Sequence, residues 1–198
     1  RVFTYKFNDY WQDIGTATAY YKANIEIISQ QARFNPGGTS PVLTTEPVSQ
    51  VPGYVNTGNV VNSIISPGCV IKGHVENSVL SPGVLIEEEA SVKNSILMSK
   101  VFVGYRSTVD HCILDEEVNI GKFCFIGFGS SFLPEYQGTT IVGKGVIVPH
   151  FITIGTKCTV LPYAGPEDFT ASTVPSGSIV SRQPVYNKLF AREETIVK

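Results

Sequence analysis

Residues of types that do chemistry are few in this chain and stand far apart. The three histidines are His74, His111 and His150. Imidazoles can bind zinc or transfer protons near neutral pH, but a zinc site needs converging ligands. These three do not share the close spacing that would force them together. His111 and His150 each follow an aliphatic residue of a regular series by two positions (Val109 and Val148), so we expect them to face solvent, with His74 at a corner.

The four cysteines are also dispersed and form no C-x-x-C pair: Cys69, Cys112, Cys124 and Cys158. An even number permits disulfides. However, isolated cysteines within apolar strands more often behave as small buried hydrophobes. We therefore expect free thiols and a reducing, cytoplasmic environment.

One carboxylate stands in an informative block, Tyr10-Trp11-Gln12-Asp13-Ile14-Gly15-Thr16. From these residues alone, the favoured interpretation is that Asp13 merely precedes and caps a helix that starts near Thr16. The sequence contains no Gly-rich nucleotide-binding loop followed by a basic residue, and no second metal-binding carboxylate can be assigned. We therefore expect that this chain does not catalyse by itself.

Composition limits the other functions that the chain can have. With 198 residues, 42% hydrophobic and 16% charged, it can form one good domain and a smaller appendage. A net charge of −2 gives no basic surface for nucleic acid. No apolar run approaches the roughly 18 residues of a membrane span, and no secretory signal opens the chain.

The fold is indicated by an internal repeat. Aliphatic residues recur every 17 positions in two series: Val75, Val92, Val109 and Ile126, and Ile86, Val103 and Ile120. An earlier coil is shorter, since Asn62-Ser63-Ile64-Ile65-Ser66-Pro67-Gly68 recurs 15 residues later as Asn77-Ser78-Val79-Leu80-Ser81-Pro82-Gly83. A strict step of six follows later: Val142, Val148, Ile154 and Val160.

Steps of six residues are typical of hexapeptide repeats, in which each unit supplies one short strand and one tight corner. Three units close a triangular coil, and coils stack about 4.8 Å apart as in a parallel sheet. The aliphatic residue of each unit and the small residue four positions later point inward. We predict a mainly β protein, a left-handed parallel β-helix from about Val60 onward. A period of 17 implies that one corner of each coil lacks a residue.

Before the repeat, Val2–Phe7 is predicted as a strand that needs neighbours, as in a fragment cut from a larger sheet, and 16–31 as a helix. Residues 32–59 contain four prolines and are predicted as an extended connector. Within the repeat, residues 131–141 should protrude as an insertion. Residues 173–180 should form a closing strand, and the tail to Lys198 a short capping helix.

The block around Asp13, together with Tyr21-Lys22-Ala23-Asn24 and the Asn-Ser-Ile-Ile-Ser-Pro-Gly-Cys-Val-Ile stretch at 62–71, resembles glucose-1-phosphate adenylyltransferase. The resemblance covers roughly residues 5–130. It implies that 1–31 is the end of an α/β nucleotidyltransferase domain, 32–59 a linker and 60–198 a regulatory, oligomer-forming β-helix. It also implies that Asp13 is a catalytic residue that helps to bind Mg²⁺, a hard cation that prefers oxygen ligands.

The resemblance further implies ATP and glucose-1-phosphate as substrates, bound by a domain preceding Arg1, and a homo- or hetero-oligomer as the assembly. Two alternatives are a free-standing hexapeptide acyltransferase and a non-catalytic regulatory subunit of the same family. Hexapeptide solenoids also include zinc hydratases, for which the histidines would be the candidate ligands.

Overall fold

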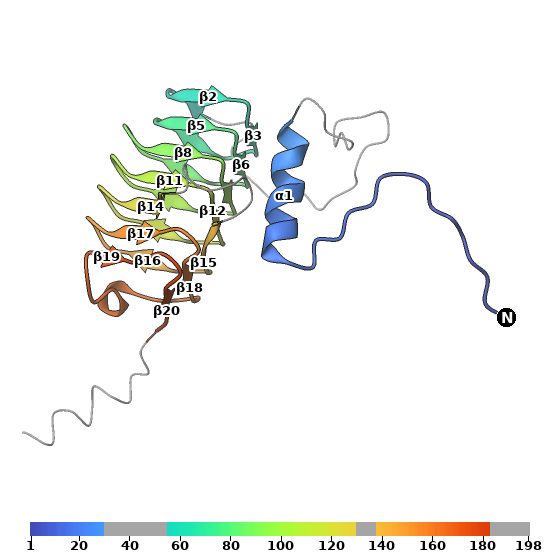
Figure 1. Ribbon diagram of the computed structural model, residues 1–198. Coiled ribbons are helices and arrows are strands. Elements are labelled where there is room, and N and C mark those ends of the chain that lie inside the picture. The colour runs from blue at the N-terminus through green and yellow to red at the C-terminus, as the bar shows by residue number, and fades with distance from the viewer. Residues whose placement is uncertain (30–54, 130–137, 183–198) are drawn as a thin grey trace, which may run out of the picture.

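A computed structural model describes residues 1–29, 55–129 and 138–182. From Val55 onward, short parallel strands wind into a left-handed β-helix of three sheets, which appears in Figure 1 as a stack of coils with one helix beside it. The predicted fold class is confirmed. The solenoid begins before residue 60, because Val55 already pairs with Val70 of the next coil.

Each sheet takes one strand from each successive coil. The first sheet contains β1 (Val55–Asn56), β4 (Val70–Ile71), β7 (Leu85–Ile86), β10 (Phe102–Val103), β13 (Asn119–Ile120) and β16 (Ile147–Val148). The second contains β2 (Asn59–Val61), β5 (His74–Glu76), β8 (Ser91–Lys93), β11 (Thr108–Asp110), β14 (Phe125–Phe128), β17 (Thr153–Gly155) and β19 (Thr173–Val174). The third contains β3 (Ile64–Ile65), β6 (Val79–Leu80), β9 (Ile96–Leu97), β12 (Cys112–Leu114), β15 (Thr140–Val142), β18 (Thr159–Val160) and β20 (Ile179–Val180).

The core consists of the predicted columns of aliphatic side chains. Val92 pairs in register with Val75 on one side and Val109 on the other, and Val109 pairs in the same way with Ile126. These side chains are at most 1% exposed. Burial of stacked branched side chains is the main favourable contribution, about 25 cal/mol per Å² of apolar surface.

The corner between the second and third sheets is the one that lacks a residue, as the period of 17 requires. Its residues adopt left-handed backbone angles, with φ of 45° at Asn94 and 52° at His111. Asparagine tolerates this region better than most residues. The next residue, Ser95, donates its hydroxyl to the Lys93 carbonyl (2.6 Å) and accepts the Cys112 N–H of the following coil (3.1 Å). The corner thus buries a polar spine whose groups are hydrogen-bonded.

The helix α1 (Ala17–Ile28) begins with Thr16 as its N-cap and ends at Ser29, slightly earlier than predicted. Val2–Phe7 does not form the predicted strand: it is extended and exposed, with Val2 97% accessible. A single strand leaves its backbone donors and acceptors unpaired, so it needs a sheet beside it. Among the described residues no strand lies against it.

The last coil closes with the 3₁₀ turn Pro166–Asp168 and with β19 and β20. The closing strand predicted at 173–180 is therefore two short strands in different sheets. The predicted insertion is shorter at its end than expected, because Thr140 and Ile141 already belong to β15. The predicted linker at 32–59 ends later than the solenoid begins, because its last residues already belong to β1 and β2. Its residues up to 54, the insertion up to residue 137 and the tail at 183–198 lie outside the described residues.

All four cysteines are buried and none is disulfide-bonded, as predicted. No helix in the described part of the chain is both long and apolar enough to span a membrane.

Candidate functional site

Asp13 lies on the segment that leads into α1. Its Oδ1 accepts a hydrogen bond from the Gly15 N–H (2.9 Å), while the Thr16 hydroxyl oxygen accepts from the Ala19 N–H (3.1 Å). Thr16 is therefore the helix cap, and Asp13 only orders the turn before it. The Asp13 side chain is exposed, so the capping role that the residues alone suggested is carried by Thr16.

An exposed carboxylate is chemically suited to Mg²⁺, which takes hard oxygen ligands and keeps substrate phosphate oxygens as well. A single carboxylate does not make a metal site. Within the described ranges, no group of three or more histidine, cysteine, aspartate or glutamate side chains could hold a metal ion. Asp13 therefore fits as one ligand of a site whose other ligands this part of the chain does not supply.

The structure changes the expected placement of two histidines. His111 does not face solvent: its side chain is 19% exposed and lies under α1, with Nδ1 2.9 Å from Oδ1 of Asp110. His74 is not at a corner but opens β5, and its Nε2 lies 3.2 Å from Oε2 of Glu76. His150 is exposed as expected, and its Nδ1 accepts the Lys122 N–H at 2.8 Å. Each imidazole has a separate local partner, which does not favour a zinc or acyltransferase centre.

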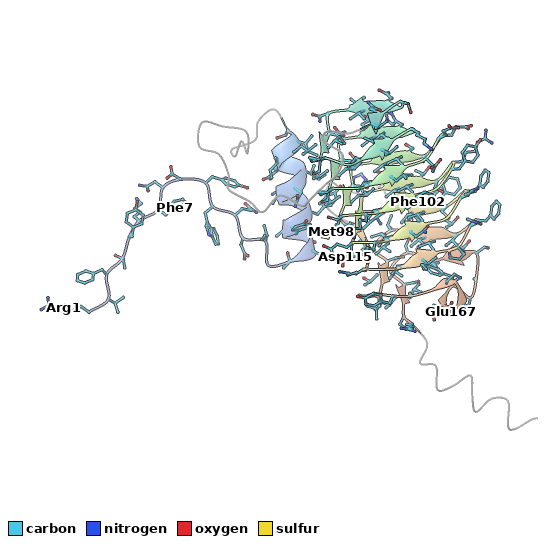
Figure 2. All side chains as sticks on the ribbon, turned by 180° about the vertical axis from the view of Figure 1, so that it is seen from behind. Arg1, Phe7, Met98, Phe102, Asp115 and Glu167 are labelled. Carbon is cyan, nitrogen blue, oxygen red and sulfur yellow. The ribbon has the colours of Figure 1, made fainter. Side chains whose placement is uncertain are left out.

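The helix α1 packs against the third sheet and the short corner. Tyr21 forms a small apolar cluster with Ile96 and Ile113 that is separate from the solenoid core. Partly buried side chains surround this cluster: Tyr20, Ile25 and Met98. Figures 1 and 2 show the helix lying along the side of the β-helix, with Met98 next to it.

A polar contact fixes the position of this helix. The Tyr21 hydroxyl donates a short hydrogen bond to the backbone carbonyl of Asn94, and the Tyr21 ring stacks on that of His111 at 6.3 Å between centroids. Tyr21 is only 1% exposed. The sequence indicated Tyr21 as part of an apolar face, but it gave no sign of this bond. The recurrence of Asn-Ser at 62, 77 and 94 was the available signal for a special corner.

The corner side chains form a ladder along the solenoid. Asn62 Nδ2 donates to Oδ1 of Asn77 (2.6 Å), Asn77 Nδ2 to Oδ1 of Asn94 (3.5 Å), and Asn94 Nδ2 to Oδ1 of Asp110 (3.0 Å). His111 takes the corner position after Asn94. The ladder therefore ends at the Asp110–His111 pair, where Tyr21 also lies.

Several charged side chains form ion pairs across neighbouring coils on the surface. Lys144 Nζ lies 2.7 Å from Oε2 of Glu116, and Arg106 Nε lies 2.6 Å from Oε2 of Glu89. These bonds lower the pKa of both glutamates. Exposed pairs contribute little to stability, typically below about 1 kcal/mol. We assign them no catalytic role.

The fold places this chain in the class of hexapeptide-repeat β-helix proteins, with one helix docked on the short corner. Residues 52–148 match the family described as "GlmU-like, C-terminal hexapeptide". The matches to curated proteins extend further and cover about nine tenths of the chain.

The chain is 36% identical over 186 residues to the glucose-1-phosphate adenylyltransferase of Acetivibrio thermocellus, covering 90% of this chain and 44% of the relative. The protein of the same name from Thermomicrobium roseum is 34% identical over 190 residues, covering 91% and 44%. That from Fervidobacterium nodosum is 38% identical over 162 residues, covering 78% and 39%. The chain belongs to the glucose-1-phosphate adenylyltransferase family. It matches the C-terminal part of these relatives and spans less than half of their length.

Proposed function

We propose that this chain is the C-terminal portion of an enzyme that makes ADP-glucose and pyrophosphate from ATP and glucose-1-phosphate. The observation that supports the proposal is that the similarity covers about nine tenths of the chain, well beyond the hexapeptide match at 52–148, in relatives that carry this name. A hexapeptide solenoid alone would support only the fold.

In this proposal, an oxygen of the glucose-1-phosphate phosphate group attacks the α-phosphorus of ATP. A new P–O–P bond forms, the bond to the β-phosphate oxygen breaks, and pyrophosphate leaves with the electron pair. Catalysis of this kind depends on positioning and on neutralising the charge of the phosphate oxygens. Mg²⁺ would supply that neutralisation. Asp13 would contribute one carboxylate ligand, held in place by the Gly15 N–H at 2.9 Å.

The test uses the whole protein with its preceding domain, assayed for pyrophosphate release with ATP, glucose-1-phosphate and Mg²⁺. Asp13→Asn should lower kcat by about 10²-fold or more, because an amide keeps the shape but not the charge that a metal ligand needs. The matched control is Asp9→Asn, on the same exposed segment, which should leave kcat within about twofold. Near-normal turnover of Asp13→Asn at saturating Mg²⁺ would remove Asp13 from the site.

We also propose that the β-helix serves assembly and regulation. The observation that supports assembly is an aromatic column at the corner between the first and second sheets, with two half-buried rings and one exposed ring. The rings of Phe123 and Phe151 stack at 5.2 Å, Tyr105 meets Phe123 edge-on at 5.6 Å, and Phe151 is 65% exposed. Partly exposed aromatic clusters of this kind are typical of surfaces that associate. A second copy or a related subunit is the proposed partner.

The buried free cysteines support a reducing location, and we propose the cytoplasm. Of the two alternatives, the non-catalytic subunit shares every feature of this chain. It is distinguished by the nucleotide-binding loop of the preceding domain, which would be degenerate, and by an inactive whole protein. The acyltransferase alternative predicts acetyl transfer by this chain alone.

A further inference from the structure

The connection between Asp13 and the β-helix is short. Asp13 is bonded to the Gly15 N–H, and Thr16 caps α1 directly after it. Tyr21 lies on the second turn of that helix. At about 1.5 Å rise per residue, it is about 7.5 Å along the axis from Thr16. A helix of this length is stiff, so a displacement at Tyr21 displaces the turn that carries Asp13.

The contact of Tyr21 with the solenoid is specific in direction. At most positions, a backbone N–H of one coil donates a hydrogen bond to a strand carbonyl of the neighbouring coil. At this corner, the His111 N–H donates to the Lys93 carbonyl (3.3 Å), and the Asn94 carbonyl is the one that accepts the Tyr21 hydroxyl. Pairing a partly buried carbonyl with a donor is favourable. Tyr21 therefore satisfies a polar group that the winding of the solenoid directs toward the helix.

The groups around this bond are themselves held. Asn94 Nδ2 donates to Oδ1 of Asp110 (3.0 Å), and the same oxygen lies 2.9 Å from Nδ1 of His111. The His111 ring is inclined by 25° to that of Tyr21. The Tyr21 hydroxyl sets the distance between α1 and the β-helix, and the stacked rings of Tyr21 and His111 set the rotation of α1 about its axis.

We propose that Tyr21 and His111 are positioning residues for the nucleotidyl-transfer site: they fix α1 on the β-helix and so fix Asp13. The inference rests on the proposed function and deepens it. It names the contact that couples the β-helix to the position of Asp13, the proposed metal ligand. Neither residue touches substrate in this proposal.

The first experiment uses this chain and needs no activity. Tyr21→Phe keeps the ring and its packing and removes only the hydroxyl. Amide hydrogen exchange within α1 should become about threefold to tenfold faster, the population change expected for one net hydrogen bond. Exchange in strands β5, β8 and β11 should not change. Tyr163→Phe is the matched control, since it removes the same atom from a ring that is 57% exposed in the last part of the solenoid.

His111→Asn tests the ring in a backbone that accepts the change. Asparagine already occupies the equivalent corner positions with φ of 44°, 47° and 45° at Asn62, Asn77 and Asn94. Its control is His150→Asn on another corner. Exchange in α1 should rise for His111→Asn and remain unchanged for His150→Asn.

The second experiment measures steady-state kinetics in the whole protein. Tyr21→Phe and His111→Asn should lower kcat by about tenfold and raise the half-activating Mg²⁺ concentration severalfold. The KM for glucose-1-phosphate should stay within about twofold, because misplacing a catalytic group affects the transition state more than the binding of substrate. The melting temperature of the β-helix should not change, which separates positioning from loss of structure.

The outcomes separate the two claims. Unchanged exchange in α1 for both variants, or equal changes in the controls, overturns the contact as a lock. Faster exchange with unchanged kcat and Mg²⁺ dependence overturns the positioning role. A wild-type protein without ADP-glucose synthesis overturns the proposed function and the catalytic part of this inference with it, while the exchange result still decides whether Tyr21 holds the helix.

Discussion

The backbone of Gly127 passes so close to Asp110 of the preceding coil that a Cβ on Gly127 would lie 2.0 Å from the Asp110 carbonyl oxygen. This approach occurs within β14, just before the short corner, where the register of β14 and β17 shifts between Ile126 and Phe128. Gly127 also has a positive φ of 78°. Two independent constraints, space and backbone angle, therefore require glycine here.

The two constraints can be separated by a matched pair of variants. Gly177 has the same φ of 78°, but a Cβ there would meet nothing within 4 Å. Gly177→Ala should cost only the left-handed penalty, about 1 kcal/mol. Gly127→Ala should cost about 2 kcal/mol more, because overpacking forces the backbone to move. Urea unfolding of both variants measures the difference, and equal costs would show that the close approach is relaxed in solution.

The register of the columns predicts the effect of a charge in the core. Val92 is 0% exposed between Val75 and Val109, so Val92→Asp should destabilise the fold by about 3–5 kcal/mol. Glu88 is exposed on a corner, and Glu88→Lys should change stability by no more than about 0.5 kcal/mol. Thermal melting of the two variants provides the comparison. Similar melting temperatures would mean that the inward and outward positions are assigned wrongly.

The cysteines should be chemically inert while the chain is folded. Burial raises the pKa of the Cys112 thiol strongly, with the nearby Asp110 charge adding to the shift. A raised pKa means less thiolate at any given pH, and thiolate is the reactive form. A thiol reagent such as DTNB should label no native cysteine rapidly and all four in guanidinium. Glu88→Cys supplies an exposed positive control. Rapid labelling of Cys112 in the native chain would contradict its burial.

Assembly is expected to be visible in solution. Light scattering of this chain should give at least twice its 21.5 kDa mass. Phe151→Glu would place a charge on the aromatic column and should shift the equilibrium toward monomer, whereas Lys157→Glu on another corner should not. A mass of one chain across a wide concentration range would contradict self-association.

This chain assayed alone should make no ADP-glucose from ATP, glucose-1-phosphate and Mg²⁺. The described residues contain no group of three or more side chains that could hold a metal ion, and a lone carboxylate such as Asp13 binds Mg²⁺ too weakly to hold it. Pyrophosphate release and acetyl transfer from acetyl-CoA should both be absent. Pyrophosphate release would reveal a nucleotide site within these residues, and acetyl transfer would favour the acyltransferase alternative.

The sequence predicted the solenoid because each coil is formed by about 17 consecutive residues, so its strands and corners follow from short-range spacing. Steps of six residues set the strands, and the period of 17 required one short corner, which the structure places at Asn94 and His111. Inward-facing residues repeat in every coil, so Val75 predicts the environment of Val92. The Asp13 block was informative only through family resemblance, since one carboxylate before a helix has several possible roles.

The sequence by itself determined the coil, its columns and the existence of the helix after Thr16. The tertiary structure decided where that helix lies, and with it the environments of Tyr21 and His111. His111 was expected to face solvent, because its position relative to Val109 directs it away from the core. It does point outward, but α1 covers that face. Periodicity along the chain describes which side chains face the solenoid core; it carries no information about a segment more than 70 residues away that packs on the outside, as the Tyr21–Asn94 bond does.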